Sequence, residues 1–595
     1  MAFGSHSSEQ AGQPDPHWLL IRLSTAFVFL LGWLGFFLYA RDNGLHTSPL
    51  SAPYSALQLF ILHTPHLEGR FNLALEAARW LAPLVFGWAT ISGAVALFEK
   101  ELRLLALPRR SGHVVICGLG RRGLELVRCF VGRGQKVVAI DKTADSESVR
   151  QAEYLGAIVV IGNVTDEATL RRARAPQAHT VVAVCGEDGT NVEISLRVSN
   201  LLGGSQVKRK SPLQCHVQLT DVALRASFQQ TQALTQAPPR CRVQFFDPFE
   251  GHVRTVVQEL PLDGDGVPVS DARRVRLVIL GLGRMGEALA LKAAQLGHFA
   301  NRQPLQIAVI DRTAFLKKDR LLFRYPALAT LCDLEFHALE IESPAARDRL
   351  QQWCDDEQTL TTVAICFDDD CRSADVALRL IPSLRTSRVA VRLSSGLGLA
   401  TMLESWTTQS GSPARPFVFG MVREGHCERA FEDTEQDALA RAAHEDFVRK
   451  RTTPTRTPQN ERALRPWDEL DNLYKDSNRQ QSDHIGIKLR AVGCKAVPLD
   501  DPRPPTVFTT PEVELLAEME HARWVAERSL AGWTFAPPPK DDAQRTSPYA
   551  VPWNRLDEVA RRFAIADDVK DYDRDPVLSI PDILKSVGKK VVRTV

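Results

Sequence analysis

The 595-residue chain has few of the features that mark a metal centre, a nucleic-acid interface or an enzyme. Its eleven cysteines form no CxxC pair, and no histidine cluster has the spacing of zinc ligands. The 73 basic and 71 acidic residues leave a net charge of +2, too balanced for a protein whose main partner is nucleic acid. No Ser/His/Asp or Cys/His motif is recognisable. We therefore predict no metal site, no nucleic-acid partner and no catalytic residues.

Two long apolar runs are present near the N-terminus. Residues 23–40 and 80–98 carry no charge, and each is long enough to cross a bilayer core of about 30 Å as a helix. We predict a membrane domain over 18–110 with transmembrane helices at 18–40 and 79–99, after a disordered tail at 1–17. Basic residues follow the second run, which predicts a multi-pass inner-membrane protein, in contact with lipid, whose C-terminal body is cytosolic.

A shorter apolar segment, 55–66, lies between the two runs and is too short to cross the membrane. It is typical of a re-entrant pore helix or of a segment that lies on the membrane surface. No TVGYG-like sequence follows it, so nothing here supplies a ring of potassium-selective carbonyls. Both interpretations stay open.

From residue 112 onward, apolar strands alternate with amphipathic helices, and the pattern occurs twice, about 160 residues apart. Continuous Val/Ile/Ala strands separated by helices indicate parallel sheets covered on both faces. We predict two α/β Rossmann-type domains at 111–262 and 271–425. A helical linker at 426–465 and a mainly α C-terminal domain at 466–595 follow, which makes the chain multidomain.

Each repeat opens with a glycine-rich turn between a strand and a helix. The first contains Gly118, Gly120 and Gly123, and its second strand ends about 20 residues later at Asp141. In such a turn the glycines admit a pyrophosphate to the helix N-terminus, and the acid binds ribose hydroxyls. The second repeat has an insertion, HFANRQP, before its acid, which makes binding there less favoured; its matching residues are Gly281, Gly283, Gly286 and Asp311.

Residues 111–200 resemble the RCK or Trk-type nucleotide-binding domain that regulates potassium conductance. The resemblance rests on HVVICGLGRRG, VVAID, the turn at 162–166 and VCGEDGTN, and 275–425 resembles the same family more loosely. That family commonly has Asp where this chain has Asn163. The resemblance adds Arg121 and Asp166 as nucleotide contacts, and it implies a ligand such as NAD, ATP, ADP, ADP-ribose or a cyclic nucleotide. Two such domains behind two membrane helices resemble ligand-gated potassium channels, in which these domains form a ring under a tetrameric pore.

The C-terminal domain contains a helix that begins at Thr510 and Pro511, with a capping threonine and acidic first-turn residues. Leu515, Met519 and Leu530 belong to the stripe that we expect to face the core. The opposite face carries His521, Trp524 and Arg528, which contact either a neighbouring helix or a ligand base and its phosphate.

The region 505–590 also resembles the repeat domain of ryanodine receptors, in the form found in bacterial proteins. In bacteria such modules look like sensors of nucleotide-derived signals, some of them in phage defence. The resemblance implies that Trp533, Asp541, Asp542 and Arg574 join the ligand site, although a structural role is the alternative. The residues that carry the match are Leu516, Ala517, Glu518, His521, Trp524, Gly532, Trp533, Lys540, Asp541, Asp542, Pro548, Trp553, Tyr572, Asp573, Arg574, Asp575 and Pro576.

Together these features predict a nucleotide-responsive ion channel or channel-like effector rather than an enzyme. Two helices per chain cannot enclose a pore, so a symmetric oligomer is required, most simply a homotetramer. The alternative is a membrane-anchored nucleotide sensor without conduction. A third hypothesis, an NAD-dependent oxidoreductase, lacks the acid/base residue that hydride transfer needs.

Overall fold

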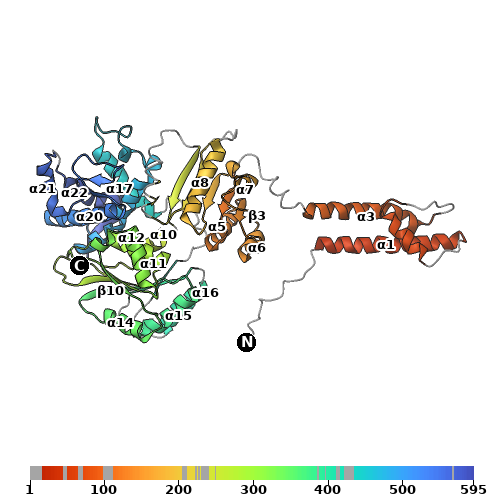
Figure 1. Ribbon diagram of the computed structural model, residues 1–595, viewed down its shortest axis with the longest axis horizontal. Helices are drawn as coiled ribbons and strands as arrows, with labels where there is room; N and C mark the ends of the chain where they lie inside the picture. The colour runs from red at the N-terminus through yellow and green to blue at the C-terminus, as the bar shows by residue number, and fades with distance from the viewer. Residues whose placement is uncertain are drawn as a thin grey trace. The chain divides into compact units, whose positions relative to one another are not determined.

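The structure is a computed structural model, and it divides the chain into two compact units, Met1–Arg109 and Arg110–Val595 (Figure 1). Most of the predicted tail at 1–17, and the connection between the units at 98–111, lie outside the described residues. The described residues are 16–44, 50–63, 71–97, 112–203, 211–221, 224–225, 228, 240–247, 249–384, 388–394, 397–409, 416–420, 435–565 and 568–594.

The N-terminal unit contains three helices, α1 (Pro16–Asp42), α2 (Ser51–Leu59) and α3 (Leu73–Leu97). Helices α1 and α3 run side by side, and α2 packs on both (Figure 1). The close contact occurs at Gly35, where a Cβ would lie 2.8 Å from the Leu75 Cα atom. Asn72 also donates a hydrogen bond from Nδ2 to the Gly35 carbonyl (2.8 Å). Glycine at this position lets the two helices touch.

One helix among the described residues, Trp18–Asp42, is long and apolar enough to cross a membrane. The second predicted span, 79–99, coincides with α3 as far as residue 97, and its role as a span stays a prediction. The outer surfaces of both helices are apolar: Phe27 is 62% exposed and Trp80 is 77% exposed. Of the predicted segment 55–66, residues 55–59 belong to α2, a turn follows, and 64–66 lie outside the described residues.

The second unit contains two six-stranded parallel sheets with the same topology. Their strand orders are β3-β2-β1-β4-β5-β6 and β12-β11-β10-β7-β8-β9. The register also repeats: Val114 of β1 pairs with Val137 of β2, and Arg276 of β7 pairs with Gln306 of β8. This is the order of a dinucleotide-binding fold, with the reversal between β1 and β4 and between β7 and β10. The structure therefore has the two Rossmann-type sheets that the repeat predicts.

The first sheet comprises β1 (Val114–Cys117), β2 (Val137–Asp141), β3 (Ile158–Ile161), β4 (Thr180–Ala183), β5 (Leu213–Gln218) and β6 (Cys241–Phe246). Its helices are α5 (Arg121–Gly132), α6 (Glu147–Tyr154), α7 (Glu167–Arg172), the 3₁₀ turn η1 (Ala175–Gln177) and α8 (Asp188–Gly203). Strand side chains such as Ile116, Ala139 and Val182 are buried with Val127 of α5 in one apolar core.

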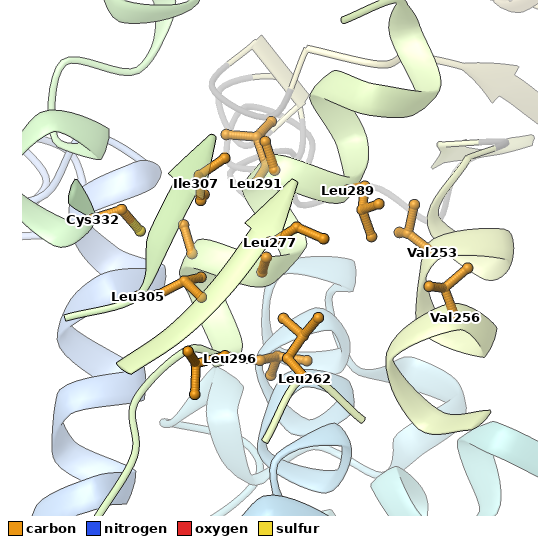
Figure 2. Close-up of a cluster of buried hydrophobic side chains, with 14 of the residues drawn as sticks. Val253, Val256, Leu262, Leu277, Leu289, Leu291, Leu296, Leu305, Ile307 and Cys332 are labelled. Carbon is orange, nitrogen blue, oxygen red and sulfur yellow. The ribbon is translucent and has the colours of Figure 1, made fainter. Parts of the chain in front are cut away.

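The second sheet comprises β7 (Arg274–Leu280), β8 (Gln306–Ile310), β9 (Asp333–His337), β10 (Thr359–Ile365), β11 (Val389–Arg392) and β12 (Phe417–Phe419). Its helices are α11 (Arg284–Leu296), α12 (Ala314–Arg324), α13 (Leu328–Leu331), α14 (Pro344–Cys354), α15 (Asp370–Leu380), η2 (Ile381–Ser383) and α16 (Leu397–Gln409). Helix α10 (Glu250–Glu259) connects the two sheets and was expected to belong to the first domain. Its residues Val253 and Val256 instead point toward Leu289 of α11, in the core of the second (Figure 2).

The C-terminal part is mainly helical, as predicted. Its elements are α17 (Glu435–Arg451), η4 (Arg462–Leu464), η5 (Trp467–Glu469), α18 (Asn472–Asp483), α19 (Ile485–Ala491), β13 (Cys494–Pro498), α20 (Thr510–Leu530), β14 (Thr534–Phe535), β15 (Thr546–Ser547), η6 (Trp553–Arg555), α21 (Leu556–Arg562), α22 (Asp571–Leu578), α23 (Ile580–Ser586) and β16 (Lys589–Arg593). Strands β13 and β16 pair antiparallel. Helix α17 falls within the predicted linker 426–465, but it packs on α18 and α23 and so is part of this body.

The second sheet and the C-terminal part share one apolar core. Leu516, Met519 and Leu530 of α20 are buried in the same cluster as Leu277 and Leu289. Ion pairs reinforce the contact, because Asp483 at the end of α18 receives Lys292 of α11 (2.8 Å) and Arg254 of α10 (2.8 Å). The second Rossmann sheet and the C-terminal helices are thus one folded body.

Candidate functional site

The first glycine-rich turn follows β1 and leads into α5. Gly118 has φ 99°, and a Cβ there would lie 3.1 Å from the Cys185 Sγ atom. A Cβ on Gly123 would lie 1.9 Å from the Gly118 carbonyl oxygen, so neither position accepts a side chain. Gly120 is the N-cap of α5, and a Cβ there would meet open space. The turn therefore leaves the helix N–H groups open, which is the geometry that binds phosphate.

Asp141 stands at the end of β2, beside this turn. Its Oδ2 accepts a hydrogen bond from the Leu119 N–H (2.9 Å), and its Oδ1 accepts one from the Thr143 N–H (2.9 Å). A carboxylate offers about four lone-pair positions, so Asp141 can still accept two ribose hydroxyls. The predicted contact Asp166 is the N-cap residue of α7, and its side chain makes no capping hydrogen bond.

The second turn repeats the arrangement with tighter packing. Gly281 has φ 89°, and a Cβ there would lie 2.7 Å from the Phe367 ring, while one on Gly286 would lie 2.5 Å from the Gly281 carbonyl oxygen. A cleft of about 610 Å³, open to solvent, lies over the turn. Its lining includes Gly281, Gly283, Asp311, Lys317 and Arg372. The phenylalanine occupies the place beside the turn that the smaller side chain of Cys185 has in the first copy.

Asp311 differs from Asp141 because all its acceptor positions are used. Oδ2 accepts from the Leu282 N–H (2.9 Å) and from the Lys317 ammonium (2.6 Å), and Oδ1 accepts from the Thr313 N–H (2.8 Å) and hydroxyl (3.0 Å). Burial alone would raise the pKa of Asp311, but the hydrogen bonds from Lys317, Thr313 and Leu282 lower it below its ordinary value. A ribose could bind here only by displacing Lys317.

Two arginines connect the turns. Arg121, the first residue of α5, donates from Nη1 to the Ser394 hydroxyl (2.6 Å) and to the Asp368 carbonyl (3.4 Å), after β11 and β10 of the second sheet. Arg284, the first residue of α11, donates from Nη2 to the Gly186 carbonyl (2.6 Å), after β4 of the first sheet. The two glycine-rich turns therefore face each other, and each sends an arginine to the strand ends of the other unit.

The predicted residues of the C-terminal domain occupy several separate places. His521 is buried, its Nε2–H donates to the Val551 carbonyl (2.8 Å), and its Nδ1 shares a hydrogen bond with the Asp573 carboxyl group (2.9 Å). Arg574 forms ion pairs with Glu514 (2.6 Å) and with two aspartates on the approach to and start of α22. Both side chains have protein partners.

Asp541 and Asp542 lie in the turn between β14 and β15. The Asp541 Oδ1 accepts the N–H groups of Ala543 (2.8 Å) and Gln544 (3.0 Å), and Asp542 pairs with Lys540 (2.9 Å). These contacts hold the turn. No group of three or more His, Cys, Asp or Glu side chains in the described part of the chain could hold a metal ion.

Arg528 lies between two aromatic rings. Its guanidinium carbon is 5.6 Å from the centre of the Trp524 ring and 5.1 Å from that of Trp533. The Trp524 ring also stacks on His521, with ring centres 5.9 Å apart. The tryptophans thus hold the arginine by cation–π contact. Of this set, Arg528 lines a cavity.

Comparison with known proteins identifies the first repeat. Residues 114–211 match the TrkA-N domain family. This part of the chain is thus similar to a TrkA-N domain. A stretch of 81 residues is 31% identical to the Trk system potassium uptake protein TrkA homolog of Pyrococcus horikoshii. A stretch of 80 residues is 36% identical to the protein of the same name in Methanothermobacter thermautotrophicus.

Each of these stretches is 13% of this chain, and the chain covers 35% and 37% of the two relatives, about a third of their length. Among solved structures, GsuK bound to ADP matches with 17% identity and a TM-score of 0.37, over 69% of this chain and 94% of that one. The GsuK channel bound to NAD matches with 15% identity and a TM-score of 0.36, over 70% and 84%.

Sequence reasoning missed the exchange of arginines and the use of Lys317. A signal for the first was present, because Arg121 and Arg284 hold the same place in GLGRRG and GLGRMG. No sequence signal pointed to Lys317, because this lysine of α12 meets Asp311 only through the fold of the loop that joins β8 to α12. The ryanodine-receptor-type resemblance of the C-terminal domain stays a prediction.

Proposed function

We propose that this protein is a nucleotide-responsive membrane protein, an ion channel or channel-like effector rather than an enzyme. In this proposal a cytosolic nucleotide binds at the glycine-rich turns and changes a pore built from two helices per subunit of a homotetramer. The observation that carries the proposal is the pair of facing Rossmann turns in a chain with an apolar helix of membrane-spanning length. The TrkA-N match and the potassium-uptake names of the relatives favour potassium as the ion.

The first turn is the better nucleotide site. Asp141 accepts two hydrogen bonds from the backbone, whereas Asp311 accepts four. Gly120 leaves the N-terminus of α5 open, and the smaller Cys185 stands where the second copy has Phe367. A ribose and its phosphates are therefore accommodated at the first turn without displacing a protein group.

The arginine exchange gives the bound nucleotide a route to the second unit. Phosphates at the first turn would lie at the N-terminus of α5, where Arg121 begins the helix, and near Gly186, the acceptor of Arg284. An anion there competes with the neutral oxygens that now hold these arginines, because charge-assisted hydrogen bonds are the stronger ones. Nucleotide binding would then change the contact between the units, and any gating requires such a difference between states.

The test is current across a planar bilayer that contains the purified protein, before and after addition of ATP, ADP, NAD, ADP-ribose or a cyclic nucleotide. We expect unitary currents that one of these nucleotides opens or closes. Asp141→Ala should abolish the response, and Asp311→Ala should leave most of it. A silent bilayer with intact oligomers that bind nucleotide would establish the alternative, an anchored sensor without conduction. Equal responses in the wild type and in Asp141→Ala would exclude the first turn as the site.

A further inference from the structure

A second cavity lies away from both glycine-rich turns, where the first Rossmann unit meets the body formed by the second unit and the C-terminal helices. Its empty space, part of it open to solvent, is about 760 Å³. The first Rossmann domain and the start of α10 contribute Arg225, Asp247 and Glu250. The body formed by the second Rossmann domain and the C-terminal helices contributes residues of α11, α18 and α20.

Most charges at this cavity are already paired. Arg225 meets Glu250 (3.3 Å), Lys292 of α11 meets Asp483 (2.8 Å), and Asp476 of α18 meets Arg479 (2.9 Å). A ligand does not need to neutralise these groups. The polar atoms that have no hydrogen-bond partner or only a weak one therefore define what the cavity can bind.

Arg528 is the first of these groups. It is 6% exposed, it lines the cavity, and its Nε–H has no hydrogen-bond partner. The nearest carboxylate, Glu527, is 3.8 Å away and already accepts hydrogen bonds from Arg523 (2.7 Å) and Ser477 (3.1 Å). A buried guanidinium donor without an acceptor is costly, and an anionic group in the cavity would satisfy it.

Gln480 and Asp247 provide acceptors in the same cavity. Gln480 is 8% exposed, and its Oε1 has no hydrogen-bond partner. Asp247 accepts the Phe249 N–H (2.8 Å) and has no ion pair within 4 Å among the described residues. Burial raises the pKa of Asp247 to about 6 against the opposing effect of Arg225. Both groups would be satisfied by an ammonium or another N–H donor.

We propose that this cavity binds a small zwitterion of the amino-acid type, with its carboxylate on Arg528 and its ammonium group on Gln480 and Asp247. The aliphatic side chains Leu291, Leu473 and Val253 would contact the ligand's side chain. The described residues that line the cavity include no aromatic ring, so it offers a nucleobase no stacking surface. The ligand would bridge the first Rossmann unit and the fused body.

The test is isothermal titration of the full-length protein with each of the free amino acids and, separately, with AMP. We expect at least one amino acid to bind, and Arg528→Met and Gln480→Leu each to weaken that binding by about tenfold or more. Arg555→Met is the matched control, because Arg555 is an exposed arginine of the same domain that pairs only with Glu558. It should bind like the wild type.

Circular dichroism and gel filtration establish that the variants fold, and Arg528→Lys keeps the charge if Arg528→Met does not fold. Failure of every amino acid to bind at millimolar concentration would overturn the proposal, as would equal binding by the wild type and both variants. Binding of AMP that is lost in Arg528→Met would assign the cavity to nucleotides and overturn it as well. ADP binding at the first turn, tested with Asp141→Ala, is a separate measurement, so the two proposals can fail independently.

Discussion

At the scale of single residues, Gly123 is the position in the first turn that tolerates a side chain least. A Cβ there would lie 1.9 Å from the Gly118 carbonyl oxygen, whereas one on Gly120 meets nothing within 4 Å. We predict that Gly123→Ala destabilises the first sheet by about 1–3 kcal/mol or more, since the backbone must move. Hydrogen exchange of β1 and α5 in the full-length protein measures the effect. Gly120→Ala is the control, and similar exchange in both variants would contradict the prediction.

His521 gives the C-terminal body a pH dependence. Burial alone would lower the pKa of His521, but hydrogen bonds to Asp573 and Val551 raise it above its ordinary value of 6.5. The stabilisation is present while His521 is protonated and Asp573, whose pKa burial also raises, is charged. It is lost as the pH rises through the raised pKa of His521. We predict a falling melting temperature over this interval in the wild type. His521→Gln should remove this component, and an unchanged slope in that variant would refute the assignment.

Residue positions were predictable where a local pattern dictates the geometry. The spacing of Gly118, Gly123 and Asp141 follows from how a strand, a turn and a helix connect, so the turn could be placed from sequence. Side chains that meet across long separations could not be placed. Arg121 and Ser394 are 273 residues apart, and nothing local to either reveals the other.

At the scale of helices, the contact between α1 and α3 depends on the missing side chain of Gly35. A Cβ there would lie 2.8 Å from both the Cα and the backbone N of Leu75. We predict that Gly35→Val separates the helices and lowers the melting temperature of the protein in detergent. Gly87→Val on α3, where a Cβ meets nothing within 4 Å, is the control. Equal melting of the two variants would show that this contact does not hold the N-terminal unit together.

Helix α20 shows where periodicity fails as a guide. The sequence predicts one apolar stripe, yet Ala517, His521 and Arg528 of the opposite face are buried as well. The helix is surrounded on most sides, and its charged groups are satisfied inside: Arg523 pairs with Glu520 (2.8 Å) and Glu527 (2.7 Å), and Lys488 also reaches Glu520. Ion pairs allow charged residues to occupy core positions, so a pattern that treats charge as exposure assigns the wrong face. The helix start was nearly right; its N-cap is Thr509, one residue earlier than predicted.

At the scale of the whole molecule, the shared core makes the C-terminal helices necessary for the second Rossmann sheet. Leu516 and Met519 are buried with Leu289, so removing the helices would expose apolar surface on α11. We predict that a chain ending at residue 420 aggregates, and that the segment 435–595, supplied as a separate chain, restores solubility. Gel filtration measures both. A truncated chain that stays monodisperse, with unchanged hydrogen exchange in α11, would contradict the prediction.

The repeat allowed the sheets to be predicted, because each copy carries its own strand order in its own sequence. Domain boundaries were less accessible. The sequence patterns around helices α10 and α17 resemble those of adjacent segments, yet both helices pack on elements outside the predicted segment that contains them. Val253 of α10 packs in the core with α11, and Asp437 of α17 pairs with Arg479 of α18 (2.5 Å). A domain boundary depends on which helix surfaces pack together, and a single sequence does not show those contacts.

The exchange of arginines between the turns has a mechanical consequence. An apolar contact between domains resists displacement, because displacement would expose apolar side chains to water. The hydrogen bonds from Arg121 and Arg284 to neutral oxygens can instead be replaced by hydrogen bonds to water at a small cost in free energy. The second sheet and the C-terminal helices are joined by the first kind of contact, and the two turns by the second. Within residues 110–595, the contact between the second sheet and the C-terminal helices is therefore rigid, and the contact between the two turns is easier to deform. The contact that can change most easily therefore lies at the place where a nucleotide would bind.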